Sequence, residues 1–132
     1  MKTPPISLAL LLRTDGSFDL LDWPKKNDNC AHLRTLYQAI GCDTVAAVDM
    51  APGLTMWLDD MGICNEAPVN AWATRLYAAY QTPRQMFYGV AVITGGPDRH
   101  GDTRGLTREQ ALSLIEKHLT GVDARIPGQR QA

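Results

Sequence analysis

The sequence lacks a hydrophobic run long enough to cross a membrane. Its longest apolar run, from Ile6 to Leu12, is much shorter than the roughly 20 residues that a transmembrane helix needs. Lys2 is not followed by a long apolar core and a small-residue cleavage site, so the sequence predicts no signal peptide. We therefore expect no association with a membrane.

Cysteine is scarce, and its spacing argues against a disulfide framework. The three cysteines, Cys30, Cys42 and Cys64, are odd in number, widely spaced and form no Cys-x-x-Cys pair. This pattern is typical of reduced thiols in the cytosol. Because His32 and His118 lie far apart in the sequence and add no ligand pair, we predict a cytoplasmic protein without a metal site.

The sequence also has no large excess of positive or negative charge. The 13 Lys and Arg residues nearly balance the 14 Asp and Glu residues, and the net charge is -1. Such a chain offers no broad basic field to a phosphate backbone. We therefore do not expect nucleic acid as a partner.

Strand and helix patterns fill most of the chain. A length of 132 residues suits one domain, which we place at residues 1–121, and the polar residues 122–132 are predicted to form a flexible C-terminal tail. We predict strands at residues 6–13, 17–23, 44–49, 54–58 and 86–93, and helices at residues 30–40, 71–80 and 107–121.

The resulting order, β-β-α-β-β-α-β-α, predicts an α+β fold with a mostly antiparallel sheet of about five strands and helices packed on one face. The strands at 6–12 and 87–93 are apolar at nearly every position. Because their side chains alternate onto two apolar faces, we expect these two strands to be neighbours at the centre of the sheet.

Turn and cap residues mark the ends of these elements. Asp15-Gly16 predicts a two-residue hairpin in which both residues have positive φ. Gly41 is a candidate helix C-cap, Asn70 a candidate N-cap, and Thr107 with Gln110 a capping box. The inward residues of the last two helices are expected to include Leu76, Tyr77, Tyr80, Ala111, Leu112, Ile115 and Leu119.

The stretch from Met86 to Thr107 is the strongest candidate for a ligand site. An apolar strand ends in Thr94-Gly95-Gly96 and is followed by a polar loop, residues 97–105. Backbone N–H groups of the two glycines offer a cradle for phosphate, with Arg99 or Arg104 adding charge. The glycine spacing excludes a Walker loop and a dinucleotide fingerprint. The alternative is a flexible turn without a ligand.

The same loop carries His100 between Asp98 and Asp102, a combination that suits acid–base or metal chemistry. No second cluster of ligating residues supports it elsewhere in the sequence. A solvated loop is therefore the favoured interpretation, and no catalytic residue is predicted.

Two further groups of residues are candidates for ligand binding, and each has a simpler structural alternative. Arg75 lies near the positive end of the helix that Asn70 begins, where it could bind an anion, although a surface arginine is the simpler interpretation. Trp57, Trp72 and Tyr77 could form a stacking platform for a base, although most such aromatics belong to the core. The residues predicted to bind a ligand are Arg75, Thr94, Gly95, Gly96, Arg99, His100, Asp102 and Arg104.

Three stretches of the chain resemble a known family. They are Gly53 to Gly62 with its tryptophan, Pro68-Val69-Asn70 with the helix that follows, and Val90 to Gly96 with Asp102 and Leu106-Thr107. The family consists of small proteins common in phages and mobile elements of bacteria, is catalogued only as a domain of unknown function, and also appears as a module of polyvalent phage proteins. The resemblance extends to Gln110, and this chain differs by an insert at Pro97 to Arg99 and a longer C-terminal helix. It implies a mobile-element setting in the host cytoplasm and implies no activity.

Three functions are compatible with these observations. The first is a non-enzymatic accessory protein of a phage or mobile genetic element that binds and inhibits a host protein, such as a defence component. The second is a binder or sponge for a nucleotide-derived signal, with its pocket across a homo-oligomer interface. The third is a hydrolase or nuclease using Asp98, His100 and Asp102. No cofactor is predicted.

Overall fold

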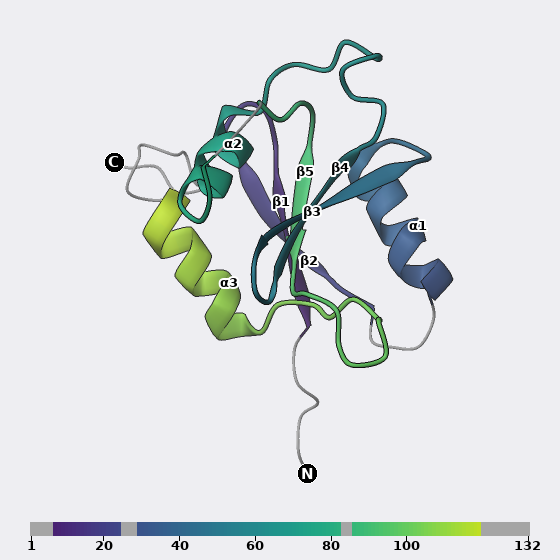
Figure 1. Cartoon of the computed structure of the whole chain (residues 1–132), viewed down its shortest axis with the longest axis vertical. Coiled ribbons are helices and arrows are strands. Elements are labelled where there is room, and N and C mark those ends of the chain that lie inside the picture. Colours follow the sequence, from purple (N-terminus) through teal and green to yellow (C-terminus); the bar gives the residue numbers. More distant parts are fainter. Residues whose placement is uncertain (1–6, 25–28, 83–85, 120–132) are drawn as a thin grey trace.

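A five-stranded antiparallel sheet forms the centre of the molecule in the computed structural model (Figure 1). The structure describes residues 7–24, 29–82 and 86–119. The predicted tail at 122–132 and the predicted helix end at Gly121 lie outside these residues. The elements are β1 Leu8–Leu12, β2 Phe18–Asp22, α1 Asn29–Ile40, β3 Val45–Ala51, β4 Leu54–Asp59, α2 Ala71–Ala78, β5 Ala91–Thr94, and α3 Arg108–Leu114 with a π-helical continuation, Ile115–Leu119.

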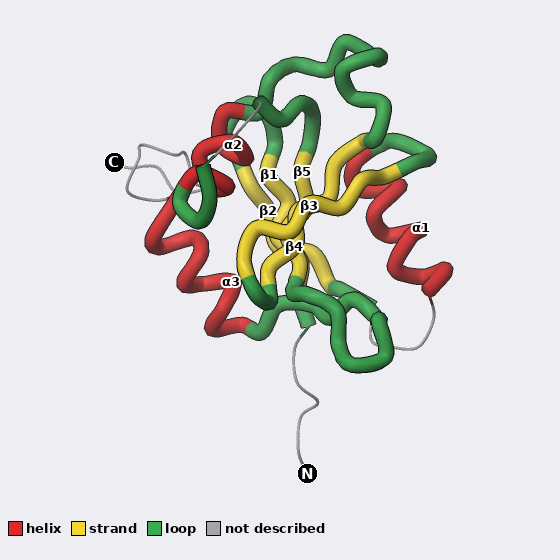
Figure 2. The backbone as a smooth tube through the Cα atoms, in the orientation of Figure 1, coloured by secondary structure: helices red, strands yellow, loops and turns green. Residues whose placement is uncertain are grey.

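The strands follow the order β2-β1-β5-β4-β3, so β1 and β5 are neighbours inside the sheet, with β2 and β3 at its edges. Leu10 of β1 lies opposite Ile93 of β5 in an antiparallel register. Figure 2 shows these strands between the helices. The predicted order of elements, the antiparallel sheet and the central pair of apolar strands are confirmed.

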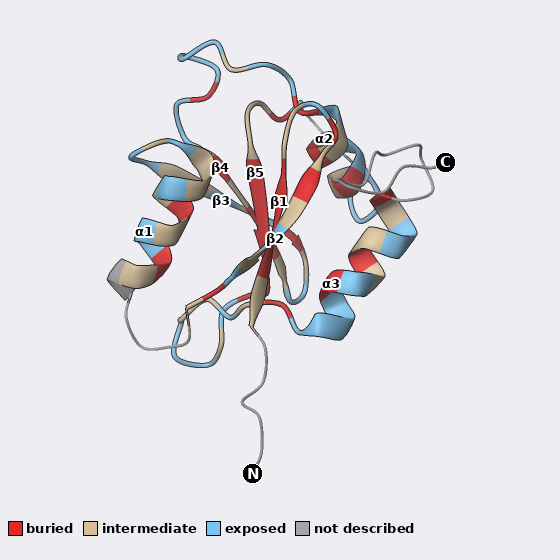
Figure 3. Ribbon diagram, turned by 180° about the vertical axis from the view of Figure 1, so that it is seen from behind, coloured by how far each residue is buried: buried red, intermediate tan, exposed pale blue. Residues whose placement is uncertain are grey.

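The helices cover both faces of the sheet, so the prediction that they pack on one face is wrong. Leu10 and Leu12 belong to a core cluster that includes residues of α2 and α3. Ala9 and Leu11 belong to a second cluster with Leu36 of α1. Because successive residues of β1 are apolar and point to opposite faces, each face needs its own cover. Figure 3 shows the buried strands between α1 on one side and α2 and α3 on the other.

The strand β5 is shorter than the apolar run that predicts it. Gly89 has φ of +82°, which interrupts the extended backbone. Before it, Tyr88 forms an isolated bridge with Val69, and the Phe87 carbonyl accepts a hydrogen bond from the Asn70 amide at 2.7 Å. The first half of the run therefore pairs with the segment that leads into α2, and Met86 is 45% exposed.

The turn between β1 and β2 differs from the predicted two-residue hairpin. The Arg13 amide donates to the Ser17 carbonyl and the Gly16 amide donates to the Arg13 carbonyl. Of the two predicted turn residues only Gly16 has positive φ, at +92°. This is a three-residue turn with glycine in the left-handed position, in which Asp15 needs no unusual conformation.

Two of the expected inward residues point toward solvent. Leu112 and Tyr80 are 44% and 38% exposed, whereas Leu114 is buried. Ala111 and Leu114 are three residues apart and share one face of α3, which places Leu112 away from the core. None of the helices in the described part of the chain is long and apolar enough to cross a bilayer.

Asn70 links three parts of this fold. Its Oδ1 accepts the Ala73 amide at 2.9 Å and so caps α2 as predicted. Its Nδ2 donates to the carbonyls of Leu12, at 3.1 Å, and Gly89, at 2.8 Å. Asn70 is fully buried, so these bonds replace water that the side chain cannot reach. The end of β1, the start of α2 and the chain entering β5 are thereby held together.

We expect Asn70→Ala to lower the free energy of unfolding by about 3 kcal/mol, because the cap and the donors to two buried carbonyls are lost together. Asn70→Asp keeps the cap but removes both donors, so it should also be destabilised. Urea unfolding measures both variants, with Asn65→Ala as an exposed control that should change by less than about 0.5 kcal/mol. An Asn70→Asp protein as stable as the parent would contradict this role.

Candidate functional site

The predicted glycine-rich loop is closed by backbone pairing. The Gly95 amide donates to the Arg104 carbonyl at 3.0 Å, and the Arg104 amide donates to the Gly96 carbonyl at 3.1 Å. The buried Thr94 hydroxyl donates to the Gly95 carbonyl and accepts from Nε1 of Trp57, both at 2.9 Å. The Gly95 amide is therefore turned toward the loop itself and not toward a phosphate.

Close packing explains why glycine occupies these positions. A Cβ at Gly95 would lie 2.8 Å from the Gly105 carbonyl oxygen, and one at Gly96 would lie 3.2 Å from Cα of Gly53. Gly105 itself lies against Leu8 and Trp23, where a Cβ would be 3.0 Å from each. The glycines let four backbone segments approach one another, a role that requires no ligand.

Trp23, which the sequence analysis did not single out, fastens this loop to the rest of the molecule. Its Nε1 donates to the Thr103 carbonyl at 3.1 Å. Its ring stacks on His32 of α1 with centroids 4.7 Å apart, and the His32 ring bonds to the Pro24 carbonyl at 3.0 Å. The buried His32 ring is thus held by Trp23 and the Pro24 carbonyl.

The tip of the loop is a hairpin turn built like the one between β1 and β2. The Asp98 amide donates to the Asp102 carbonyl, and the Gly101 amide, with φ of +86°, donates to the Asp98 carbonyl. Asp98 Oδ1 accepts the amides of His100, at 2.8 Å, and Asp102, at 3.0 Å. The bond from the His100 amide is the main cause that lowers the pKa of the Asp98 carboxyl.

These contacts give Asp98 a structural role in the turn. Arg99 and His100 are exposed at its tip. Within residues 7–24, 29–82 and 86–119, no three His, Cys, Asp or Glu side chains come together as a metal site.

The structure does not bring Arg75 to this loop. The Arg75 guanidinium lies 5.4 Å from the centre of the Trp72 ring, and the Trp72 indole packs on Gly16. Leu12, next to that turn, is opposite Ala91, whereas Gly95 follows the other end of β5. Arg75 and the other seven predicted site residues therefore lie at opposite ends of the sheet.

The aromatic residues do not form one platform. Trp57 packs with the cluster under α1, whereas Trp72 and Tyr77 pack with the cluster under α2 and α3. The sheet separates Trp57 from Trp72 and Tyr77, so the three side chains cannot stack on the same base. The simpler interpretation, that these residues belong to the core, is the one that the structure supports.

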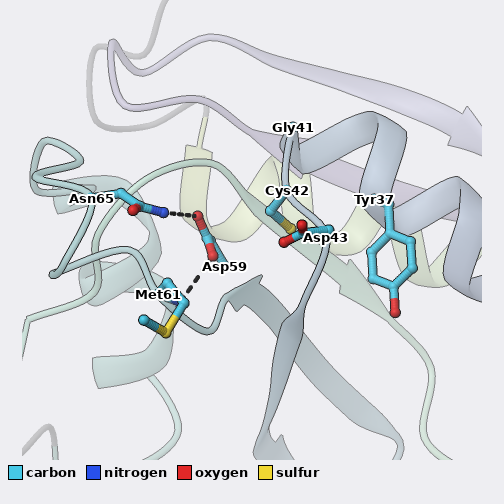
Figure 4. A pocket seen from close by; sticks show the side chains of 7 residues that line it. All are labelled: Tyr37, Gly41, Cys42, Asp43, Asp59, Met61 and Asn65. Carbon is cyan, nitrogen blue, oxygen red and sulfur yellow. Dashed lines mark hydrogen bonds between the residues drawn. The ribbon is translucent and has the colours of Figure 1, made fainter.

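A cleft that the sequence analysis missed lies where α1 ends and β4 ends (Figure 4). Its volume is about 510 Å³. Gly41 ends α1 in the left-handed conformation, with φ of +81°, and so directs Cys42 and Asp43 into the cleft. The lining residues are Tyr37, Gly41, Cys42, Asp43, Asp59, Met61 and Asn65.

Asp59 organises the far wall of this cleft. Its Oδ1 accepts the Met61 amide at 2.9 Å, and its Oδ2 accepts Nδ2 of Asn65 at 3.3 Å (Figure 4). Burial raises the pKa of the Cys42 thiol, and the negative charges of Asp59 and Asp43 add to this effect. The cleft therefore carries negative charge, and its thiol loses its proton less readily than a free cysteine.

A second, more apolar cleft lies on the other side of Asp59. Its volume is about 430 Å³, and it is lined by Ala46, Val48, Leu58, Asp59, Asp60, Gly62, Ile63, Cys64, Met86, Phe87 and Tyr88. A third cleft, of about 340 Å³, lies at the other end of β3 and includes Asp49 and Gln81, together with Gly96 and Pro97 of the glycine-rich loop. Every charged residue that lines these three clefts is an aspartate.

Large apolar side chains stand exposed beside these clefts. Ile63 is 68% exposed, and Met61 and Met86 are 46% and 45% exposed. Met61 lines the first cleft, and Ile63 and Met86 line the second. We call the first two clefts, together with these side chains, the β3-side surface.

The fold is that of a small α+β domain with a three-layer arrangement, and the β3-side surface is acidic and partly apolar. The chain belongs to the family described as Domain of unknown function (DUF3846), whose model matches residues 6–120. No curated protein matches the chain. No solved structure matches it.

The acidity of the first cleft has a measurable consequence at Cys42. We expect Asp59→Asn to speed alkylation of Cys42 by iodoacetamide about threefold at pH 8, because loss of a nearby negative charge lowers the pKa of the thiol and raises the thiolate fraction. Mass spectrometry of the modified peptide gives the rate. Asp22→Asn, on the far edge strand, should leave it unchanged, and an unchanged rate in Asp59→Asn would contradict the proposed electrostatics.

Proposed function

We propose that this protein acts by binding another protein through the β3-side surface. The observation that carries the proposal is the cluster of exposed apolar side chains, Met61, Ile63 and Met86, beside clefts whose charged residues are all aspartates. Isolated apolar residues are common on protein surfaces, but a group around concave sites is typical of an interaction surface. Methionine adapts its shape to a partner, which suits this role.

The family setting supports a more specific proposal. We propose a non-enzymatic accessory protein of a phage or mobile genetic element, acting in the host cytoplasm, that binds and inhibits a host protein such as a defence component. The resemblance of the chain to one family that is common in phages and mobile elements supports the setting. The acidic and apolar character of the surface supports binding to a protein as the mode of action.

The other two functions have less support. A nucleotide-derived signal carries phosphates, which need cations or free amides, yet Arg75 lies at the opposite end of the sheet from Arg104 and the Gly95 amide is bonded to its own loop. Hydrolysis at the loop tip would use Asp98, whose carboxylate accepts two backbone amides of its own turn. No observation favours either function over protein binding.

A photo-crosslinking amino acid tests the proposed function directly. Placed at Ile63, in a cell that carries the gene, it should form a discrete adduct with another protein on irradiation. The matched control is the same substitution at Leu112, which is 44% exposed on α3 and should form no such adduct. Identical adducts at both positions, or none at Ile63, would contradict the proposal.

A further inference from the structure

Strand β3 forms one edge of the sheet in the described part of the chain. Within residues 7–24, 29–82 and 86–119, its one paired neighbour is β4. The Asp60 amide donates to the Thr44 carbonyl at 3.1 Å. Because bonded and non-bonded pairs alternate in an antiparallel ladder, Ala46 and Val48 face β4 with their backbone groups, and Val45 and Ala47 face outward.

The outward groups are available for pairing. Among residues 7–24, 29–82 and 86–119 no hydrogen-bond partner faces the backbone of Val45 or Ala47 from the open side. Further along β3, Nε2 of Gln81 donates to the carbonyls of Asp49, at 3.1 Å, and Met50, at 2.9 Å. Gln81 and the bulge between Asp49 and Ala51 close that end of the edge. The open part of the edge therefore runs from Thr44 to Val48.

An apolar cleft lies beside this open edge. Ala46 and Val48 line the second cleft together with Leu58, Ile63 and Met86. A strand added next to β3 would point every second side chain to this face of the sheet. Main-chain bonds to the edge and side-chain pockets beside it are the two parts of recognition by strand addition.

The negative charges beside the open edge favour a positively charged segment as the added strand. Asp43 and Asp60 are exposed near its beginning and Asp49 near its closed end, with Asp59 between the two clefts. A second copy of this chain, paired through the same edge, would bring its own aspartates toward these and be repelled. A segment carrying Lys or Arg would be attracted.

We propose that β3 receives an extended segment of the partner protein as a sixth strand, with apolar side chains in the cleft of Ala46, Val48 and Ile63 and a Lys or Arg beside Asp43 or Asp60. This inference rests on the proposed function, because it names the kind of partner segment that the β3-side surface binds. It limits the paired stretch to the open part of the edge, from Thr44 to Val48.

Selection from a library of random linear peptides, displayed on cells and exposed to the native full-length chain, tests the inference. The enriched peptides should combine alternating β-branched or aromatic residues with a Lys or Arg. Their affinity, measured by fluorescence anisotropy, should fall as salt is raised. Enrichment of acidic or proline-rich sequences, or of none, would overturn the inference.

Two pairs of variants then locate the binding site. Ala47→Pro removes an outward N–H without cutting the ladder to β4 and should weaken peptide binding by about tenfold. Its control is Leu20→Pro on the other edge strand, where the bonds from Arg13 to Ser17 and from Trp23 to Ser7 imply that the Leu20 amide also faces outward. This control should bind like the parent.

Charge reversal gives a test that does not disturb the backbone. Asp60→Lys should weaken binding of the basic peptides by about tenfold, whereas Asp22→Lys on β2 should not. Peptide binding that survives both Ala47→Pro and Asp60→Lys would overturn strand addition. If both variants still bound the peptides and the cross-linked adduct at Ile63 still formed, the proposed protein-binding function would be supported and strand addition alone would be wrong. Sedimentation showing a dimer that Ala47→Pro dissociates would instead assign the edge to a second copy.

Discussion

The hydrogen bonds of Asn70 are the constraint on which the arrangement of this molecule depends. One buried amide caps α2 and also joins the end of β1 to the chain entering β5. The position of α2 in turn places Gln81, beyond its last turn, against the carbonyls of Asp49 and Met50. The core of the fold and the closed end of the β3 edge are thus connected through one short helix. A change at Asn70 should therefore also affect the closed end of the β3 edge, which the residue does not touch.

Much of the fold could be predicted because its signals are local. The capping box at Thr107 and Gln110 and the N-cap at Asn70 are short patterns with a direct geometric meaning, and both are present. The apolar strands β1 and β5 were placed correctly as central neighbours. The same two-sided apolar character required helices on both faces, which the one-face prediction overlooked. The length of β5 could not be predicted, because the positive φ of Gly89 and the pairing of Tyr88 with Val69 depend on distant segments.

The candidate site was harder to predict, for a physical reason. Glycines in a polar loop suggest a ligand, yet Gly95 is required by the close approach of Gly105, at the far end of the same loop, and Gly96 by that of Gly53, which is remote in sequence. The β3-side surface, by contrast, gathers side chains from the end of α1, the edge strand and the segment after β4. No spacing rule joins these segments. The one local signal was the presence of Met61 and Ile63 in a polar turn, where large apolar residues have no obvious structural role.

In the proposed function, the protein binds its partner through the β3-side surface and not through the glycine-rich loop. Hydrogen–deuterium exchange of the chain, alone and in complex with the protein that becomes cross-linked at Ile63, tests it most directly. We expect slower exchange in the complex at the amides of Val45 and Ala47 and in the segment from Asp60 to Asn65. Protection confined to residues 95–105, with β3 exchanging as in the free chain, would contradict it.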